Sequence, residues 1–358
     1  MFYRENGQFK SSYQADQQIL GIRQDRWFMF GLIAFAAVAV PMLASDYMFR
    51  AILIPFLIVS LAAIGLNLLV GYCGQISLGH AAFMAIGAYA AYNLIVRVPQ
   101  LNFLVALVLA GLIAAAVGVL FGLPSLQIKG LYLGVATLAA QFFIDWMFAR
   151  VKWFTNYSPS GSVSTASIEM FGYKFDSPIE RYLLVLAIVI VFTLLAKNLV
   201  RGHIGRSWMA MRDMDVAAEV IGIRPMRAKL SAFAVSAFYA GIAGALWGFI
   251  HLGSWEPAAF SVNFSLNLLF MIIIGGMGSI LGSFIGAAFI VLLPITLNQV
   301  LPPLGTLIGM NFGTAMASHL EFMIFGALII FFLIVEPLGI ARLWAIGKEK
   351  LRLWPFPH

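Results

Sequence analysis

Long apolar stretches, separated by short polar or glycine- and proline-containing breaks, run through most of the chain. A hydrocarbon layer of ~30 Å is crossed by about 20 apolar residues in a helix, and open sheets cannot cross it because their backbone groups would lack partners. The pattern therefore predicts an all-α membrane protein with about ten transmembrane helices. The expected spans are 27–44, 51–70, 80–96, 103–121, 131–148, 182–196, 230–250, 266–275, 280–297 and 322–335.

Composition strengthens this prediction. Of the 358 residues, 62% are hydrophobic and only 10% are charged, whereas about a quarter of a soluble domain is charged. So few charged residues could not cover a water-exposed surface, which excludes a soluble globular protein. The single cysteine, Cys73, excludes an intramolecular disulfide and a metal site built from several cysteines.

The positions of the basic residues predict the orientation. They concentrate in an N-terminal arm (1–26), in a loop (197–229) and in a C-terminal tail (342–358), and cytoplasmic segments carry an excess of Lys and Arg. An even number of spans also returns both termini to one side. We therefore expect both termini and the 197–229 loop to be cytoplasmic, with a polytopic membrane domain over 27–341 and an external loop over 149–181. The net charge of +7 reflects this orientation, and no nucleic-acid partner is expected.

Signals of enzyme chemistry are missing from the sequence. The five histidines are isolated, and no glycine-rich loop ends in the Lys-Ser/Thr pair that binds phosphate. We expect no catalytic residue, metal or cofactor on this chain. Carboxylates lie near the span ends, with Asp145 the deepest, so an ion-coupled secondary carrier would depend on Asp145 or His80. Without such coupling, the energy for transport must come from a partner.

Four segments carry a resemblance to a known family. They are 65–89 (GLNLLVGYCGQISLGHAAFMAIGAY), 130–139 (GLYL and, after it, TLA), 205–245 and 274–279 (IGGMGS). In this order they resemble the membrane-spanning permease subunits of ATP-binding-cassette (ABC) importers for branched-chain and other hydrophobic amino acids, specifically the larger of the two permeases. The resemblance covers about residues 50–340.

The resemblance implies partners and cargo. The partners are a second, related permease, two cytoplasmic P-loop ATPases that bind ATP and Mg²⁺, and a periplasmic substrate-binding protein. The location is the bacterial inner membrane, where lipid surrounds the chain. The implied cargo is a branched-chain or related hydrophobic amino acid, and permeases for urea, short amides or aromatic acids are the alternative.

A glycine-rich break at 71–79 separates the second and third expected spans. Glycines interrupt the apolar stretch and polar side chains add hydrogen-bonding groups, as in the broken helices that line translocation paths. A polar cytoplasmic turn is the alternative. A second break at Gly275–Gly278 mirrors the first. The candidate path residues are Asn67, Gln75, Ser77, His80, Tyr132, Thr137, Gly275 and Gly278.

The loop at 197–229 contains one predicted short helix between Arg212 and Gly222. Aspartates can cap its start, alanines favour the helix and a glycine ends it. The resemblance implies that this is the coupling helix that docks on the ATPase, although its Ala-Ala-Glu order departs from the family's Glu-Ala-Ala. A solvated surface helix is the alternative. The candidate coupling residues are Asp213, Asp215, Ala217, Ala218, Glu219 and Gly222.

Overall fold

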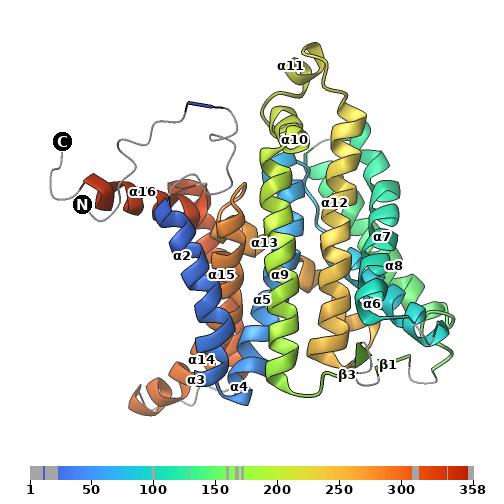
Figure 1. The fold of residues 1–358 in the computed structure, drawn as a ribbon, viewed down its shortest axis with the longest axis vertical. Coiled ribbons are helices and arrows are strands. Elements are labelled where there is room, and N and C mark those ends of the chain that lie inside the picture. Colours follow the sequence, from blue (N-terminus) through green and yellow to red (C-terminus); the bar gives the residue numbers. More distant parts are fainter. Residues whose placement is uncertain are drawn as a thin grey trace.

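Helices make up nearly all of the computed structural model, which describes residues 11–12, 23–98, 101–128, 130–158, 161–165, 169–170, 173–308, 314–336 and 338–353 (Figure 1). The α-helices are α2 (Arg23–Ala34), α3 (Val40–Leu43), α4 (Asp46–Met48), α5 (Ile54–Asn67), α6 (His80–Arg97), α7 (Phe103–Gly122), α8 (Leu131–Arg150), α9 (Pro178–Arg201), α10 (His203–Asp213), α11 (Asp215–Val220), α12 (Pro225–Leu246), α13 (Val262–Gly275), α14 (Ile280–Ile308), α15 (Thr314–Val335) and α16 (Gly339–Leu353). The strands are β1 (Val163–Ser164), β2 (Glu169–Met170), β3 (Tyr173–Lys174) and β4 (Ser254–Trp255). Short π-helical turns at 35–39, 49–53, 68–72 and 247–252 continue several of these helices.

Each expected span coincides with a helix, which confirms the prediction of an all-α membrane protein. Among the described residues, eight helical segments are long and apolar enough to cross a membrane. Two expected spans fall outside these eight: α6, which begins inside the bundle, and α15, where only Met323–Phe332 forms a shorter apolar helix. The count of ten therefore stays a prediction.

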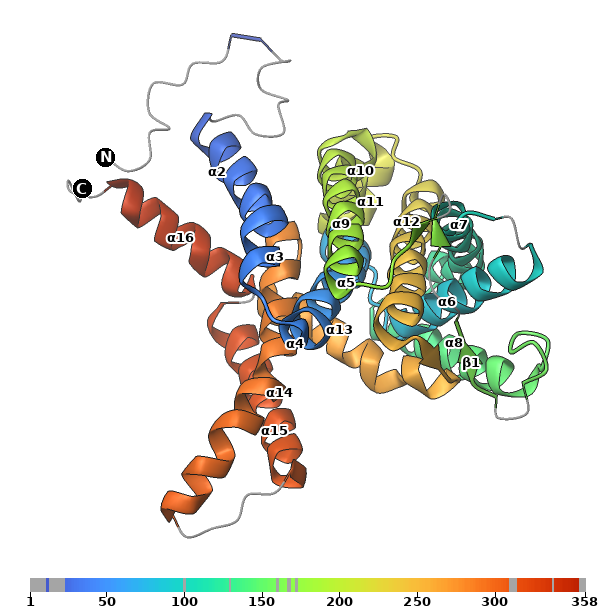
Figure 2. The same ribbon diagram turned by 60° about the horizontal axis from the view of Figure 1, so that its bottom comes forward.

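The core of the molecule is built around α12, which packs against α5, α6 and α7. Small side chains let these helices approach closely, since a glycine places no Cβ between two backbones. Gly87 of α6 lies against the backbone of Gly241, and Gly244 of α12 lies against the backbone of Met84. Figure 2 shows α14 and α15 on one side of this core, with α2 and α16 beside them. The apolar segment Arg26–Leu43 has none of its residues buried within this chain.

The two long polar segments lie at opposite ends of the bundle. Helices α10 and α11 extend from one end, and the strands lie at the other (Figure 1). Strand β1 pairs antiparallel with β4 and so ties the expected external loop to the connection between α12 and α13. In that loop the Tyr173 hydroxyl donates to Glu180 Oε1 at 2.6 Å, which raises the pKa of Tyr173. The expected orientation requires the 197–229 loop and the 149–181 loop to lie at opposite ends, as they do. The domain boundaries and the sides of the membrane on which the termini lie stay predictions. Most of the 1–26 arm and the end of the tail (354–358) lie outside the described residues.

Candidate functional site

The first glycine-rich break is an extended segment that enters the bundle. The helix that begins at α5 ends at Cys73, Gly74 adopts a left-handed conformation (φ +71°), and α6 starts at His80. The backbone N–H of Leu78 donates to Thr137 Oγ1 at 2.9 Å, six residues into α8. At 1.5 Å per residue, this contact lies about 9 Å from the start of α8. The segment therefore interrupts the helices and reaches into the bundle, although Gly74 at its start is exposed. Its assignment to a translocation path stays a prediction, and a polar cytoplasmic turn stays the alternative.

Gln141 of α8 supplies a hydrogen-bond partner for the buried N-terminus of α6. The first N–H groups of a helix have no intrahelical acceptor, and an unpaired donor is costly in a membrane. Gln141 Oε1 accepts from the Ala82 N–H at 2.6 Å, and Ser265 Oγ accepts from the Ala81 N–H at 2.8 Å. The Gln141 amide nitrogen donates to the Phe260 carbonyl at 2.8 Å and to Asp145 Oδ1 at 3.0 Å. Sequence analysis missed Gln141, although an amide within an apolar span was a signal for it.

Three predicted path residues bring unpartnered polar atoms to this break. Gln75 Oε1 and Ser77 Oγ are buried and have no hydrogen-bond partner among the described residues. The His80 ring is fully buried beside the Ala62 backbone, and neither ring nitrogen reaches hydrogen-bond geometry. Buried polar groups normally have partners, and the assignment of these three residues to a translocation path stays a prediction.

Asn67 joins the first break to the second. Its side-chain amide donates to the Ser279 carbonyl at 2.8 Å and to Ser283 Oγ at 2.9 Å, and its Oδ1 accepts from the Gly278 N–H at 2.8 Å. Gly71 lies against the same groups, because a Cβ there would overlap Asn67 Oδ1 and the Gly278 nitrogen. The two glycine-rich breaks are thus in direct contact, although they are about 200 residues apart in sequence.

Arg212 of α10 connects the end of the bundle that carries α10 and α11 to the contact between the two breaks. Its Nη1 donates to the Gly71 carbonyl at 2.9 Å, and its guanidinium pairs with Asp213 at 2.9 Å. A Cβ added at Gly74 would lie 3.0 Å from Arg212 Cγ, and one added at Gly278 would lie 3.4 Å from its Nη1. Arg212 therefore bonds to the first break, lies beside the second, and links them to α10.

A small polar cavity of about 300 Å³ lies between the first break and α10–α11. Its lining includes Gln75, Arg212, Asp215 and Lys229. Lys229 is 4% exposed, and its ammonium donates to the Ser125 carbonyl at 3.2 Å. The cavity is large enough for a small polar or zwitterionic molecule.

The predicted short helix between Arg212 and Gly222 corresponds to α11, whereas Arg212 and Asp213 end the preceding helix. Helix α10 ends at Asp213, Met214 is extended (φ −155°), and α11 covers only six residues from Asp215. Asp215 is the first residue of α11 and its Oδ1 accepts from the Val216 N–H at 2.9 Å, but the N-cap position is Met214 and no side chain caps the helix there. The predicted stop is confirmed: Gly222 has φ +92°, and the following N–H, of Ile223, bonds back to the Ala218 carbonyl.

Helix α11 presents an apolar surface at the tip of the bundle. Ala218 is buried against the chain, whereas Ala217 and Glu219 are exposed. Four apolar side chains around them are more than 70% exposed. We call these the tip residues: Met214, Val216, Val220 and Ile221. Helix α10 behind them is fixed to α12, because the buried Trp208 Nε1 donates to Ser231 Oγ at 3.0 Å.

The remaining predicted residues are placed as follows. Gly275 ends α13 with its backbone against Gly282, next to the Asn67 contact. Thr137 is buried at the first break. Tyr132, on the same helix, is 80% exposed and lies on the outside of the chain. Asp145 is half-buried and accepts the Gln141 bond.

Comparisons with known proteins find transport permeases among the relatives of this chain. The high-affinity branched-chain amino acid transport system permease protein LivM of Salmonella typhimurium is 32% identical over 251 residues, 64% of this chain and 58% of the relative. LivM of Escherichia coli is 33% identical over 239 residues, 60% of this chain and 56% of the relative. The probable permease LivM of Methanocaldococcus jannaschii is 22% identical over 325 residues, 81% and 92% of the two chains.

The aligned part of the chain thus spans little more than half the length of the two bacterial relatives. No solved structure matches the chain significantly. The apolar helices and these relatives make it a multi-pass protein of the inner membrane. The family model described as the permease component of branched-chain amino acid transport systems matches residues 48–333, and the chain belongs to this family of ABC permeases.

Proposed function

We propose that the chain is one permease subunit of an ABC importer that carries branched-chain or related hydrophobic amino acids across the bacterial inner membrane. Family membership and the names of the relatives support this function. The proposed partners are a second, related permease, two cytoplasmic ATPases that bind ATP and Mg²⁺, and a periplasmic substrate-binding protein. Specificity for the cargo would then be shared with the binding protein, and urea, short amides or aromatic acids stay alternatives.

The observation that carries the coupling step is the apolar surface of α11. Exposed apolar side chains at a bundle end that is expected to face water indicate a docking surface. In this proposal the tip residues bind a groove on the ATPase. A six-residue helix held by short turns transmits the movement of a partner better than a flexible loop would.

The contacts of Arg212 extend this coupling into the path. Movement of α10 and α11 would act on the Gly71 carbonyl, and through it on the joined breaks. A change of this kind could alter how Gln75, Ser77 and His80 face the path while the outer helices keep their packing. The polar cavity beside Lys229 would then be the inner mouth.

Replacing Val220 by aspartate tests the docking surface. Val220 is 83% exposed, so the stability of the chain itself should change little. A carboxylate at the centre of an apolar interface should cost at least about 2 kcal/mol of binding, which is about 30-fold in affinity. The intact chain is purified in mild detergent from its native membrane. We expect a P-loop ATPase and a second permease to co-purify with it. The Val220→Asp variant should lose most of the ATPase and keep the permease.

Tyr157→Asp is the matched control. Tyr157 is 68% exposed near the other end of the bundle and has φ +58°, a conformation that aspartate tolerates. Equal recovery of the ATPase with both variants would show that α11 is not the docking helix. If the wild-type chain brings no ATPase at all, the importer proposal fails, and Asp145 becomes the candidate coupling residue of an ion-coupled carrier.

A further inference from the structure

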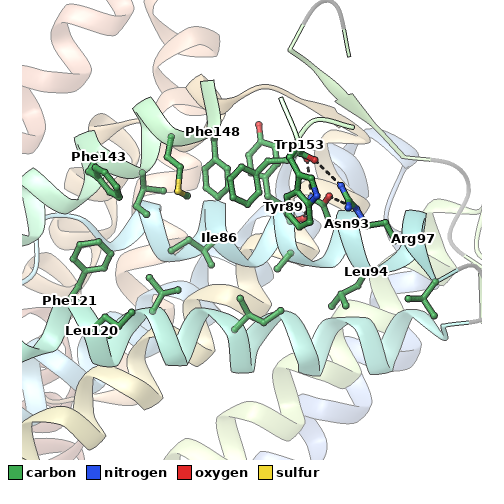
Figure 3. A pocket seen from close by; sticks show the side chains of 17 residues that line it. Ile86, Tyr89, Asn93, Leu94, Arg97, Leu120, Phe121, Phe143, Phe148 and Trp153 are labelled. Atoms are coloured by element: carbon green, nitrogen blue, oxygen red, sulfur yellow. Dashed lines mark hydrogen bonds between the residues drawn. The ribbon is translucent and has the colours of Figure 1, made fainter. Parts of the chain in front are cut away.

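A cavity of about 630 Å³ lies between α6, α7 and α8, away from the two breaks. Aliphatic and aromatic side chains form nearly all of its lining (Figure 3). Phe121 and Phe143 lie toward one end, and Asn93 and Arg97 lie at the other (Figure 3). Several lining side chains at its rim are about half exposed, among them Phe143 and Leu120, so the groove opens onto the side of the chain.

The polar end of the groove is built around Arg97. Its guanidinium carbon lies 3.8 Å above the ring of Trp153, and one nitrogen donates to the Trp153 carbonyl at 3.0 Å. Its Nε donates to Asn93 Oδ1 at 3.2 Å, and the buried Asn93 amide donates to the Phe154 carbonyl at 2.9 Å. Among the described residues these bonds use two of the five N–H groups of Arg97, and the rest can bind an anion.

The length and position of the groove match one leaflet of a bilayer. Its lining follows α6 from Ile86 to Val98, which at 1.5 Å per residue is about 18 Å. One leaflet contributes about half of a hydrocarbon core of ~30 Å. Arg97 lies at the end of α6 next to the loop that is expected to be external, so the polar end falls at the outer interface.

The chemistry of the lining selects the ligand. An amino acid needs a partner for its ammonium as well as for its carboxylate, and among the described residues no carboxylate lines the groove. A phospholipid instead needs a long apolar channel with a cation at one end. We propose that this groove binds one phospholipid of the outer leaflet, with an acyl chain between α6, α7 and α8 and the phosphate at Arg97. The lipid would fill the space between these helices and stiffen the side of the bundle that carries Thr137 and Gln141.

The test measures how much phospholipid the chain retains. The full-length protein is purified in detergent, washed until bulk lipid is gone, and its lipid is quantified by mass spectrometry. We expect about one phospholipid per wild-type chain. Ala90→Phe fills the groove and Arg97→Gln removes the cation, and each should retain at least about fivefold less. Val105→Phe places the same final side chain at an exposed position on α7 outside the groove, and it should match the wild type.

Thermal unfolding separates loss of the site from loss of the fold. Added phospholipid should raise the melting temperature of the wild type and of Val105→Phe, and it should do so much less for Ala90→Phe and Arg97→Gln. Equal lipid retention by Ala90→Phe and the wild type would overturn the proposal. Binding of radiolabelled leucine that Ala90→Phe abolishes would also overturn it, because the groove would then hold the cargo. A photoreactive residue in place of Phe143 that cross-links to a second permease would also overturn the proposal, because a protein would then occupy the groove.

Discussion

Replacing Asn67 by leucine is expected to lower the stability of the chain by at least about 2 kcal/mol and to abolish uptake. Leucine has a similar size but leaves the Gly278 N–H and the Ser279 carbonyl without their partner. Each buried group left unpaired costs about 1–3 kcal/mol. Thermal unfolding of the purified chain measures the first effect, and uptake of labelled leucine by cells that carry the complete importer measures the second.

Asn298→Leu is the control for this change. Asn298 is exposed on α14, and among the described residues its amide bonds to the Pro294 carbonyl one turn away. The Asn298→Leu variant should unfold near the wild-type temperature and support normal uptake. Wild-type stability and uptake in Asn67→Leu would show that the contact between the two breaks is dispensable.

Replacing Arg212 by glutamine is expected to uncouple ATP hydrolysis from transport. The bond to the Gly71 carbonyl comes from a charged donor, and such bonds contribute about 1.5–3 kcal/mol. If this energy differs between the two states of the path, its loss shifts their equilibrium roughly 10- to 100-fold. We expect uptake to fall by about tenfold or more, while the ATPase still co-purifies and still hydrolyses ATP.

Arg206→Gln provides the comparison on the same helix. Arg206 is exposed on α10, so its variant should retain uptake and carry the same change in net charge. Parallel loss of ATPase binding and uptake in Arg212→Gln would indicate that Arg212 supports the docking surface and not the link to the breaks. Unchanged uptake would remove Arg212 from the coupling route.

The helical architecture could be predicted because apolar stretches of membrane-spanning length are a local signal. The same holds for both breaks, since glycines such as Gly71 and Gly278 are visible as interruptions, and for the end of α11 at Gly222. Helix α10 was not predicted, and neither was the extended Met214 that separates it from α11, because that conformation has no sequence signature.

The polar contacts at the site could not be predicted for a different reason. Gln141 meets Ala82 across 59 positions, Arg212 meets Gly71 across 141 and Asn67 meets Gly278 across 211. One sequence without its relatives carries no information about such pairs. The same limit explains why Tyr132 was wrongly placed with the residues at the break. A helical pattern predicts which residues share one face of a helix, but not which face packs against the bundle.

The contact between Asn67 and Gly278 also bears on how the chain is made. Ribosomes add about 5–20 residues per second, so the 211 residues between the two positions take about 10–40 s to synthesise. During that time the Asn67 amide is already on a newly made apolar helix without its final partner, in surroundings where an unpaired amide is costly. Insertion of this helix should therefore depend on a temporary partner, such as the insertion machinery or a neighbouring helix, until α13 and α14 arrive.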